Sequence, residues 1–105
     1  MREFPEKDWK LFRQKLPKWQ EAYMTRLCEE YMELLQADKR GSERFWELEK
    51  RMKEDQKKTG VVATMSRSKM IYNLMNLVAD GAITMDDLDE FSEETKEAVR
   101  VLLRW

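Results

Sequence analysis

The sequence predicts an all-α fold, a small single-domain helical bundle of about five to six helices. The chain has 105 residues, a length typical of one domain. It contains only three glycines and two prolines, and such a scarcity of helix-breaking residues favours helix throughout. Apolar residues make up 42% of the chain and charged residues 39%, with a formal net charge of −1. This balance is typical of a folded domain and not of a disordered chain.

Two helices are expected first, near residues 5–16 and 18–38. Pro5 suits the first position of a helix, where its missing N–H has no partner to lose. Pro17 is expected to end that helix and to start the next one. Apolar residues recur at helical spacing on both sides of it: Trp9, Phe12 and Leu16 before it, and Trp19, Ala22, Tyr23, Leu27, Tyr31, Leu34 and Leu35 after it, with a second row of Met24, Cys28 and Met32.

A third helix is expected near 42–58, antiparallel to the second. Gly41 is expected to stop the preceding helix, and Ser42 is a suitable N-cap for the new one. The apolar positions of this helix are Phe45, Leu48 and Met52, with Trp46 adjacent.

The third helix should end in a solvated or frayed segment, because residues 53–59 include no apolar side chain. Gly60 is the expected stop, and the β-branched run 61–65 is expected to be a short extended linker. The whole chain, 1–105, is then one helical domain, with N-terminal helices in 1–58 and capped C-terminal helices in 66–105.

Three further helices are expected near 66–79, 84–90 and 93–104. Their predicted N-caps are Ser66, Thr84 and Ser92, residue types whose side-chain oxygen accepts from a free backbone N–H. Asp87, three residues after Thr84, completes a variant of the capping box. Asp80-Gly81 should end the first of these helices. The three helices are expected to cover the apolar face of the hairpin formed by the second and third helices.

The chain contains no histidine and one cysteine. This excludes Ser-His-Asp and Cys-His catalytic arrangements and most zinc sites. No glycine-rich phosphate loop exists, because the three glycines stand far apart. We therefore expect a protein that is not an enzyme, with no catalytic residues, no cofactor and no metal.

One segment, residues 76–87, partly matches a calcium-binding EF-hand loop. It offers only three side-chain ligands, Asn76, Asp80 and Asp87, and Val78 stands where an oxygen ligand is needed. A helix that ends at a glycine, followed by a helix capped by a threonine, has the same sequence pattern, and this is the interpretation we favour.

Cys28 lies within the apolar rows of the second helix and is expected to be a buried small hydrophobe. One cysteine forms no internal disulfide, the first residues lack the apolar core of a signal peptide, and no apolar run is long enough to cross a bilayer. These features predict a cytoplasmic protein.

The N-terminal helix combines aromatic residues with a candidate basic face, namely Lys7, Lys10, Arg13 and Lys18. Such a helix can grip phosphates, which makes a nucleic-acid-associated accessory protein the alternative function. An ordinary core helix with a cationic outer side is the preferred interpretation, since the chain has no basic excess. The acid-rich stretch 80–97 would repel phosphates.

Eight methionines and four tryptophans are the most suggestive positive signal. Methionine adapts to irregular surfaces, and tryptophan often anchors interfaces. A methionine-rich core explains the same composition, and the two interpretations stay open. The expected function is non-enzymatic, by protein–protein interaction or self-association, through Trp46, Met52 and Trp105.

Three segments together carry a family resemblance: the opening Met-Arg-Glu-Phe-Pro-Glu-Lys-Asp-Trp-Lys-Leu-Phe, the element beginning Phe45-Trp46, and Met65-Ser-Arg-Ser with Ile71-Tyr-Asn. The chain resembles a group of short uncharacterised all-helical bacterial proteins, associated with Firmicutes and mobile elements. Some members carry the label multidrug transporter. The resemblance implies no catalytic or binding residue.

Overall fold

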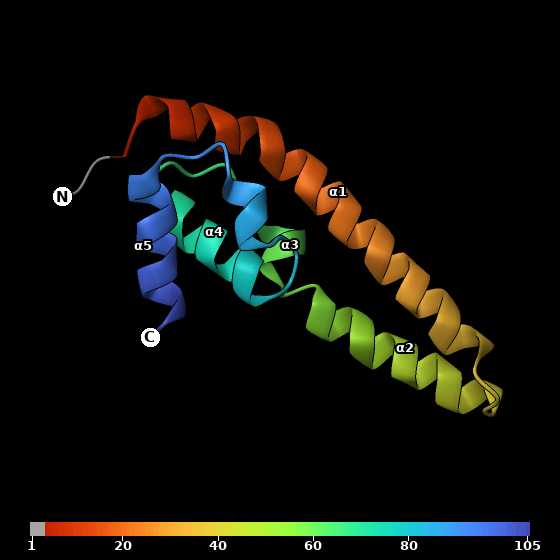
Figure 1. The fold of residues 1–105 in the computed structure, drawn as a ribbon. Coiled ribbons are helices and arrows are strands. Elements are labelled where there is room, and N and C mark those ends of the chain that lie inside the picture. The colour runs from red at the N-terminus through yellow and green to blue at the C-terminus, as the bar shows by residue number, and fades with distance from the viewer. Residues whose placement is uncertain (1–3) are drawn as a thin grey trace.

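The computed structural model describes residues 4–105, and every regular element within them is helical. The elements are α1 (Glu6–Gln36), α2 (Gly41–Asp55), α3 (Thr59–Val62), α4 (Met70–Ala79), the 3₁₀ helix η1 (Met85–Leu88) and α5 (Glu93–Leu103). Figure 1 shows α1 running along the whole molecule, with the other helices on one side of it. The predicted all-α fold is confirmed. Residues 1–3, which open the segment carrying the family resemblance, lie outside the described residues.

Helix α1 continues through Pro17, so the predicted break between 5–16 and 18–38 is wrong. Proline removes one backbone hydrogen bond, here the one to the carbonyl of Arg13. Both residues are exposed, so that water can satisfy this carbonyl. Phe12 and Leu16 before the proline and Tyr23 after it are buried along the same side of the helix. Packing on both sides therefore outweighs the lost bond, and Figure 1 shows α1 as one curved helix.

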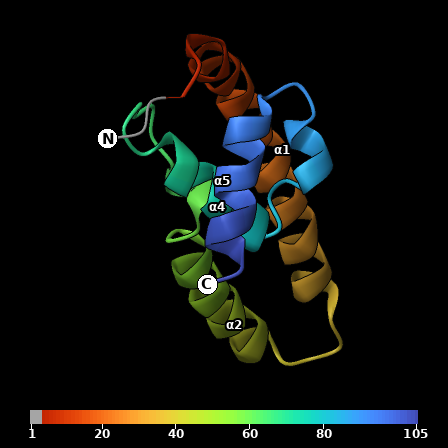
Figure 2. The same ribbon diagram turned by 60° about the vertical axis from the view of Figure 1, so that its left-hand side comes forward.

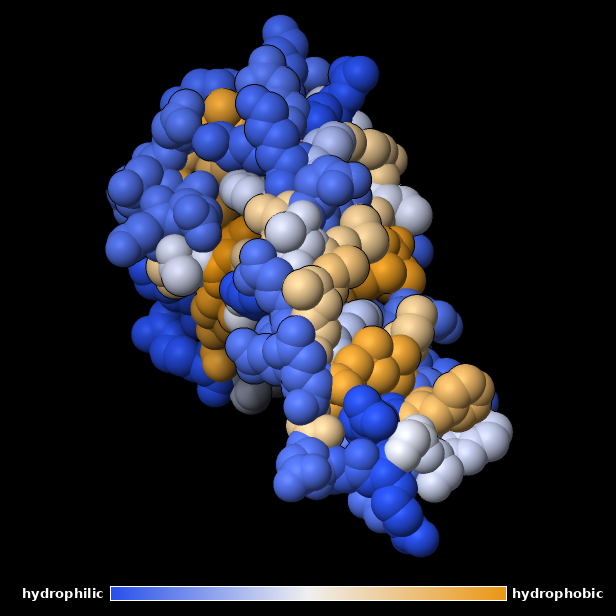
Figure 3. All heavy atoms as spheres, turned by 90° about the vertical axis from the view of Figure 1, so that its right-hand side faces the viewer, coloured by the Kyte–Doolittle hydropathy of each residue, from blue (hydrophilic) through white to orange (hydrophobic). Residues whose placement is uncertain are grey.

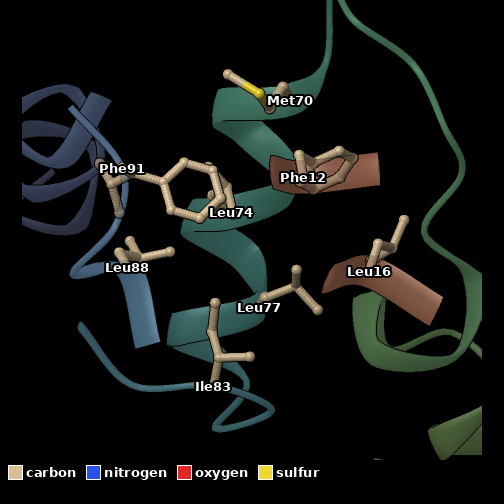
Figure 4. Packing of buried hydrophobic residues seen from close by; sticks show 9 residues of the cluster. Phe12, Leu16, Met70, Leu74, Leu77, Ile83, Leu88 and Phe91 are labelled. Carbon is tan, nitrogen blue, oxygen red and sulfur yellow. The ribbon is translucent and has the colours of Figure 1, made fainter. Parts of the chain in front are cut away.

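The core lies between the first half of α1 and the C-terminal helices. Figure 4 shows Phe12 and Leu16 of α1 beside Leu74 and Leu77 of α4, within one packed cluster. The other buried members of this cluster are Met70, Ile83, Leu88, Phe91 and Val99. We call this part of the molecule, the first half of α1 with α3, α4, η1 and α5, the body.

A buried carboxylate fastens the start of α1 to the start of α5. Asp8 is fully buried and accepts hydrogen bonds from the backbone N–H of Ser92 (3.0 Å), from the hydroxyl of Ser92 (2.6 Å) and from the hydroxyl of Thr95 (2.5 Å). The Ser92 hydroxyl also accepts from the Thr95 N–H, which confirms Ser92 as the N-cap of α5. One acid thus joins residues more than eighty positions apart.

Helix α2 runs antiparallel to the second half of α1, and this predicted hairpin is confirmed (Figures 1 and 2). The expectation that the C-terminal helices cover it is wrong, because they pack on Phe12 and Leu16, earlier in α1. The molecule measures 53 × 27 × 22 Å, and its radius of gyration is 16.4 Å, against about 13 Å for a compact chain of this length. We call residues 23–36 of α1 together with α2 the arm, because they project from the body.

Several predicted helix ends differ from the structure. Gly41 is the first residue of α2, with Arg40 as N-cap, so Ser42 is not the cap. Gly60 does not stop a helix but lies in α3, where its missing Cβ leaves room for the Tyr23 ring. The predicted extended run 61–65 is therefore helical in its first two residues.

Of the other predicted helix ends, one is wrong and two are confirmed. Ser66 forms a turn, and α4 begins four residues later, at Met70. The capping box of Thr84 with Asp87 is confirmed. Gly81 follows the end of α4 with φ of +78°, a conformation that glycine adopts without strain.

Candidate interaction surface

Polar contacts hold the two helices of the arm together. From α2, the Arg44 guanidinium donates to the carbonyl of Leu35 (2.7 Å), and Arg51 donates to Glu30 (2.9 Å). At the base of the arm, the Tyr31 hydroxyl donates to Asp55 at 2.6 Å. Asp55 is the one buried residue of α2. The side of α2 that faces α1 is therefore mainly polar.

Burial and this hydrogen bond affect the ionisation of Tyr31. Removal from water disfavours the charged phenolate, and donation to the Asp55 carboxylate stabilises the neutral hydroxyl. Together they raise the pKa of Tyr31 to about 12. The raised pKa extends the pH range over which the neutral Tyr31 hydroxyl donates to Asp55.

Leu48 lies within this row and is half-buried, whereas the exposed apolar side chains Phe45 and Met52 lie beside it. Phe45 and Met52 each follow an arginine that faces α1. On α1, Met24, Cys28 and Leu35 likewise follow the inward residues Tyr23, Leu27 and Leu34.

These two rows lie on the same side of the arm. Each residue advances by about 100° around its helix. In an antiparallel pair of right-handed helices, the residue that follows an inward-facing residue therefore points to the same side of the pair on both helices. We define the arm face as this side, formed by Met24, Cys28, Met32 and Leu35 of α1 with Phe45 and Met52 of α2. Met32 belongs to it because it lies one helical turn from both Cys28 and Leu35. Trp46 starts from the outer side of α2 and joins the arm face through its ring contact with Phe45.

Most of the arm face is open to solvent. Phe45 is 61% exposed, Trp46 62% and Met32 59%. The rings of Phe45 and Trp46 touch each other edge to face, with centroids 4.9 Å apart. Figure 3 shows orange and tan atoms gathered beside blue ones at this end of the molecule. A contiguous apolar surface of this kind on a small protein marks an interaction site.

The structure brings two of the three candidate interaction residues together. Trp46 and Met52 lie on α2 in the arm. Trp105 is 97% exposed, but it follows α5 at the C-terminus, away from α2 in Figure 1. Met32, Leu35 and Phe45 are exposed as well, although the sequence did not predict them as surface residues. The signal that could have found them is the polar row Arg44, Arg51 and Asp55, which shows the face of α2 that packs.

Cys28 is exposed, and the prediction that it is buried is wrong. It sits in the arm face, where neither α2 nor the body covers it. The prediction assumed that the C-terminal helices would lie against the hairpin.

All four residues of the candidate basic face are exposed on α1: Lys7, Lys10, Arg13 and Lys18. The Arg13 guanidinium lies over the Trp9 ring, 6.0 Å from its centre, and Arg67 lies 5.4 Å from the same ring. Lys10 and Arg13 line an open hollow of about 510 Å³ with Gln14 and Met65. Arg67 is also paired with Glu6 at 2.6 Å, which reduces the positive charge beside Trp9.

Two acids of the segment 76–87 serve structural roles. Asp80 accepts from the backbone N–H of Thr59 (3.2 Å), and Asp87 belongs to the capping box of Thr84. Within residues 4–105, no group of three or more cysteine or acidic side chains is placed to hold a metal ion. The segment 76–87 is thus built as the end of α4, a turn and η1.

No protein-family model matches this chain, and neither the curated proteins nor the solved structures include a match. In the part of the chain that the structure describes, no helix is both long and apolar enough to cross a membrane.

Proposed function

We propose that this protein is a cytoplasmic, non-enzymatic interaction protein, which associates with a protein partner or with itself through the arm face. One observation carries the proposal: Phe45 and Met52 form an exposed apolar row on α2, and no apolar side chain of this helix is fully buried. In a helix of a monomeric domain, such a row normally faces the core. Here the core is complete without it, so the row is free to bind another molecule.

The arm's construction supports the same proposal. Its two helices are joined by hydrogen bonds and ion pairs from polar side chains, which leaves the aromatic and methionine side chains for an external contact. Phe45 and Trp46 supply rigid anchors, whereas Met32 and Met52 adapt to the shape of a partner.

Photo-crosslinking in the source cell tests this proposal. A benzophenone amino acid replaces Phe45 in one variant and Tyr72 in a matched control. Tyr72 is similarly exposed, at 59%, but belongs to α4 in the body. We expect a discrete protein adduct from position 45 and none from position 72. The absence of any adduct at position 45, with the variant folded and expressed, would refute the proposal.

The alternative, nucleic-acid association, relies on Lys7, Lys10 and Lys18, which form no ion pair within residues 4–105 and lie on the outer side of α1. Phosphate contacts weaken steeply with salt. Binding to nonspecific DNA at low salt that falls with added salt, and that is lost when these three lysines become glutamate, would support this function over the first.

A further inference from the structure

We infer that the occupant of the arm face is a second copy of this chain. In this arrangement, two arms pack face to face about a two-fold axis and form a four-helix bundle, to which each copy contributes α2 and the second half of α1. The inference rests on the proposed function and names the partner. It follows from the area of the face, its charge and its shape.

The exposed apolar area is sufficient for a reversible dimer. An aromatic side chain offers about 150–250 Å², so Phe45 and Trp46, at 61% and 62% exposure, present roughly 200–300 Å² together. Met32, Leu35 and Met52, at 59%, 42% and 41% exposure, add about 200 Å². Two copies would bury roughly 900 Å² of apolar surface before the polar border is counted. That total is below the roughly 1,200–2,000 Å² of stable specific interfaces and falls in the range of weak, reversible contacts.

The charge of α2 beside the arm face is compatible with a second copy. The ionic residues that border the face on α2, Glu49 and Lys53, already pair with each other. Nearby, Arg51 pairs with Glu30, and Lys39 pairs with Glu47. On α2, the charges beside the face are therefore neutralised within the chain and do not repel a second copy. On α1, Glu29 and Glu33 follow Cys28 and Met32, are exposed and form no ion pair within residues 4–105.

The shape of the arm fits the same partner. A pair of antiparallel helices with one apolar side is half of a four-helix bundle, and packing against an identical pair completes the bundle. A two-fold axis makes the contact self-complementary, so that a single face on each copy is enough. The projection of the arm from the body leaves room for this approach (Figure 1).

Analytical ultracentrifugation of the purified chain over roughly 5–500 µM tests the inference. We expect the mean mass to rise across this range toward that of a dimer, and Phe45→Glu to abolish the increase. Because Phe45 is exposed in the monomer, this variant should keep its helical circular dichroism and its melting temperature at low concentration. The matched control Tyr72→Glu, on the body, should dimerise like the natural chain.

Cys28 supplies a second readout that needs no mutation at the anchor. It is the one cysteine in the chain and is exposed on the arm face. Its alkylation by iodoacetamide should slow as the protein concentration rises in the natural chain, and should be independent of concentration in Phe45→Glu.

A chain that stays monomeric at every concentration would overturn self-association, as would a dimer that Tyr72→Glu disrupts and Phe45→Glu does not. These results are distinguishable from failure of the proposed function. If the photo-crosslink at position 45 captures a different protein in the cell while the purified chain is monomeric, the partner inferred here is wrong and the proposed function stands.

Discussion

Substitution of Asp8 by alanine is expected to destabilise the body more than any other change of one charged residue. The carboxylate is fully buried and accepts three hydrogen bonds, two from Ser92 and one from Thr95. A bond to a charged group contributes about 1.5–3 kcal/mol, and the substitution strands buried donors. Relief from burying the carboxylate offsets part of this loss. We therefore expect a net cost of about 3 kcal/mol.

The assay is urea unfolding of the natural chain and of Asp8→Ala, followed by circular dichroism. In a thermal unfolding experiment on a domain of this size, the same loss of about 3 kcal/mol corresponds to a fall in melting temperature of roughly 12–24 °C. A double-mutant cycle with Thr95→Val isolates one of the three bonds, and a coupling of about 1 kcal/mol or more is expected, because the two side chains are in direct contact at 2.5 Å.

The matched control is Asp38→Ala, since Asp38 is an exposed acid in the turn after α1. It should change stability by no more than about 0.5 kcal/mol. If Asp8→Ala costs less than about 1 kcal/mol, or if its coupling to Thr95→Val is within error of zero, the carboxylate does not fasten α1 to α5 and the reasoning fails.

Three further predictions concern single sites. Gly60→Ala should cost about 1–3 kcal/mol in chemical denaturation, because its Cβ would lie 2.8 Å from Cγ of Tyr23; an unchanged midpoint would show that the ring moves aside freely. Leu74→Ala should cost about 2–5 kcal/mol, since Leu74 is fully buried at the centre of the core; a loss below about 1 kcal/mol would contradict the core described here. For Tyr31, the folded pKa of about 12 exceeds the ordinary value of 10.0, so its contribution to stability is complete below pH 10 and is lost as the pH rises through 12. Ultraviolet titration should show one tyrosine ionising near pH 12 that disappears in Tyr31→Phe, and an identical titration of both proteins would refute this.

Local sequence determined much of the secondary structure. The spacing of apolar residues identified each long helical region, and Thr84, Ser92 and Gly81 act at the helix ends where their chemistry placed them. These features depend on contacts within one or two turns, which a single sequence records directly.

Tertiary structure decided what the sequence pattern left ambiguous. Pro17 stays within α1 because buried residues before and after it pack along one continuous helix. Cys28 and Phe45 are exposed because the C-terminal helices pack on the first half of α1 and not on the hairpin. An apolar row shows only that a helix has a side to cover. Which surface covers it depends on the competition among all such rows in the chain, and here the body completed its core and left the arm face open.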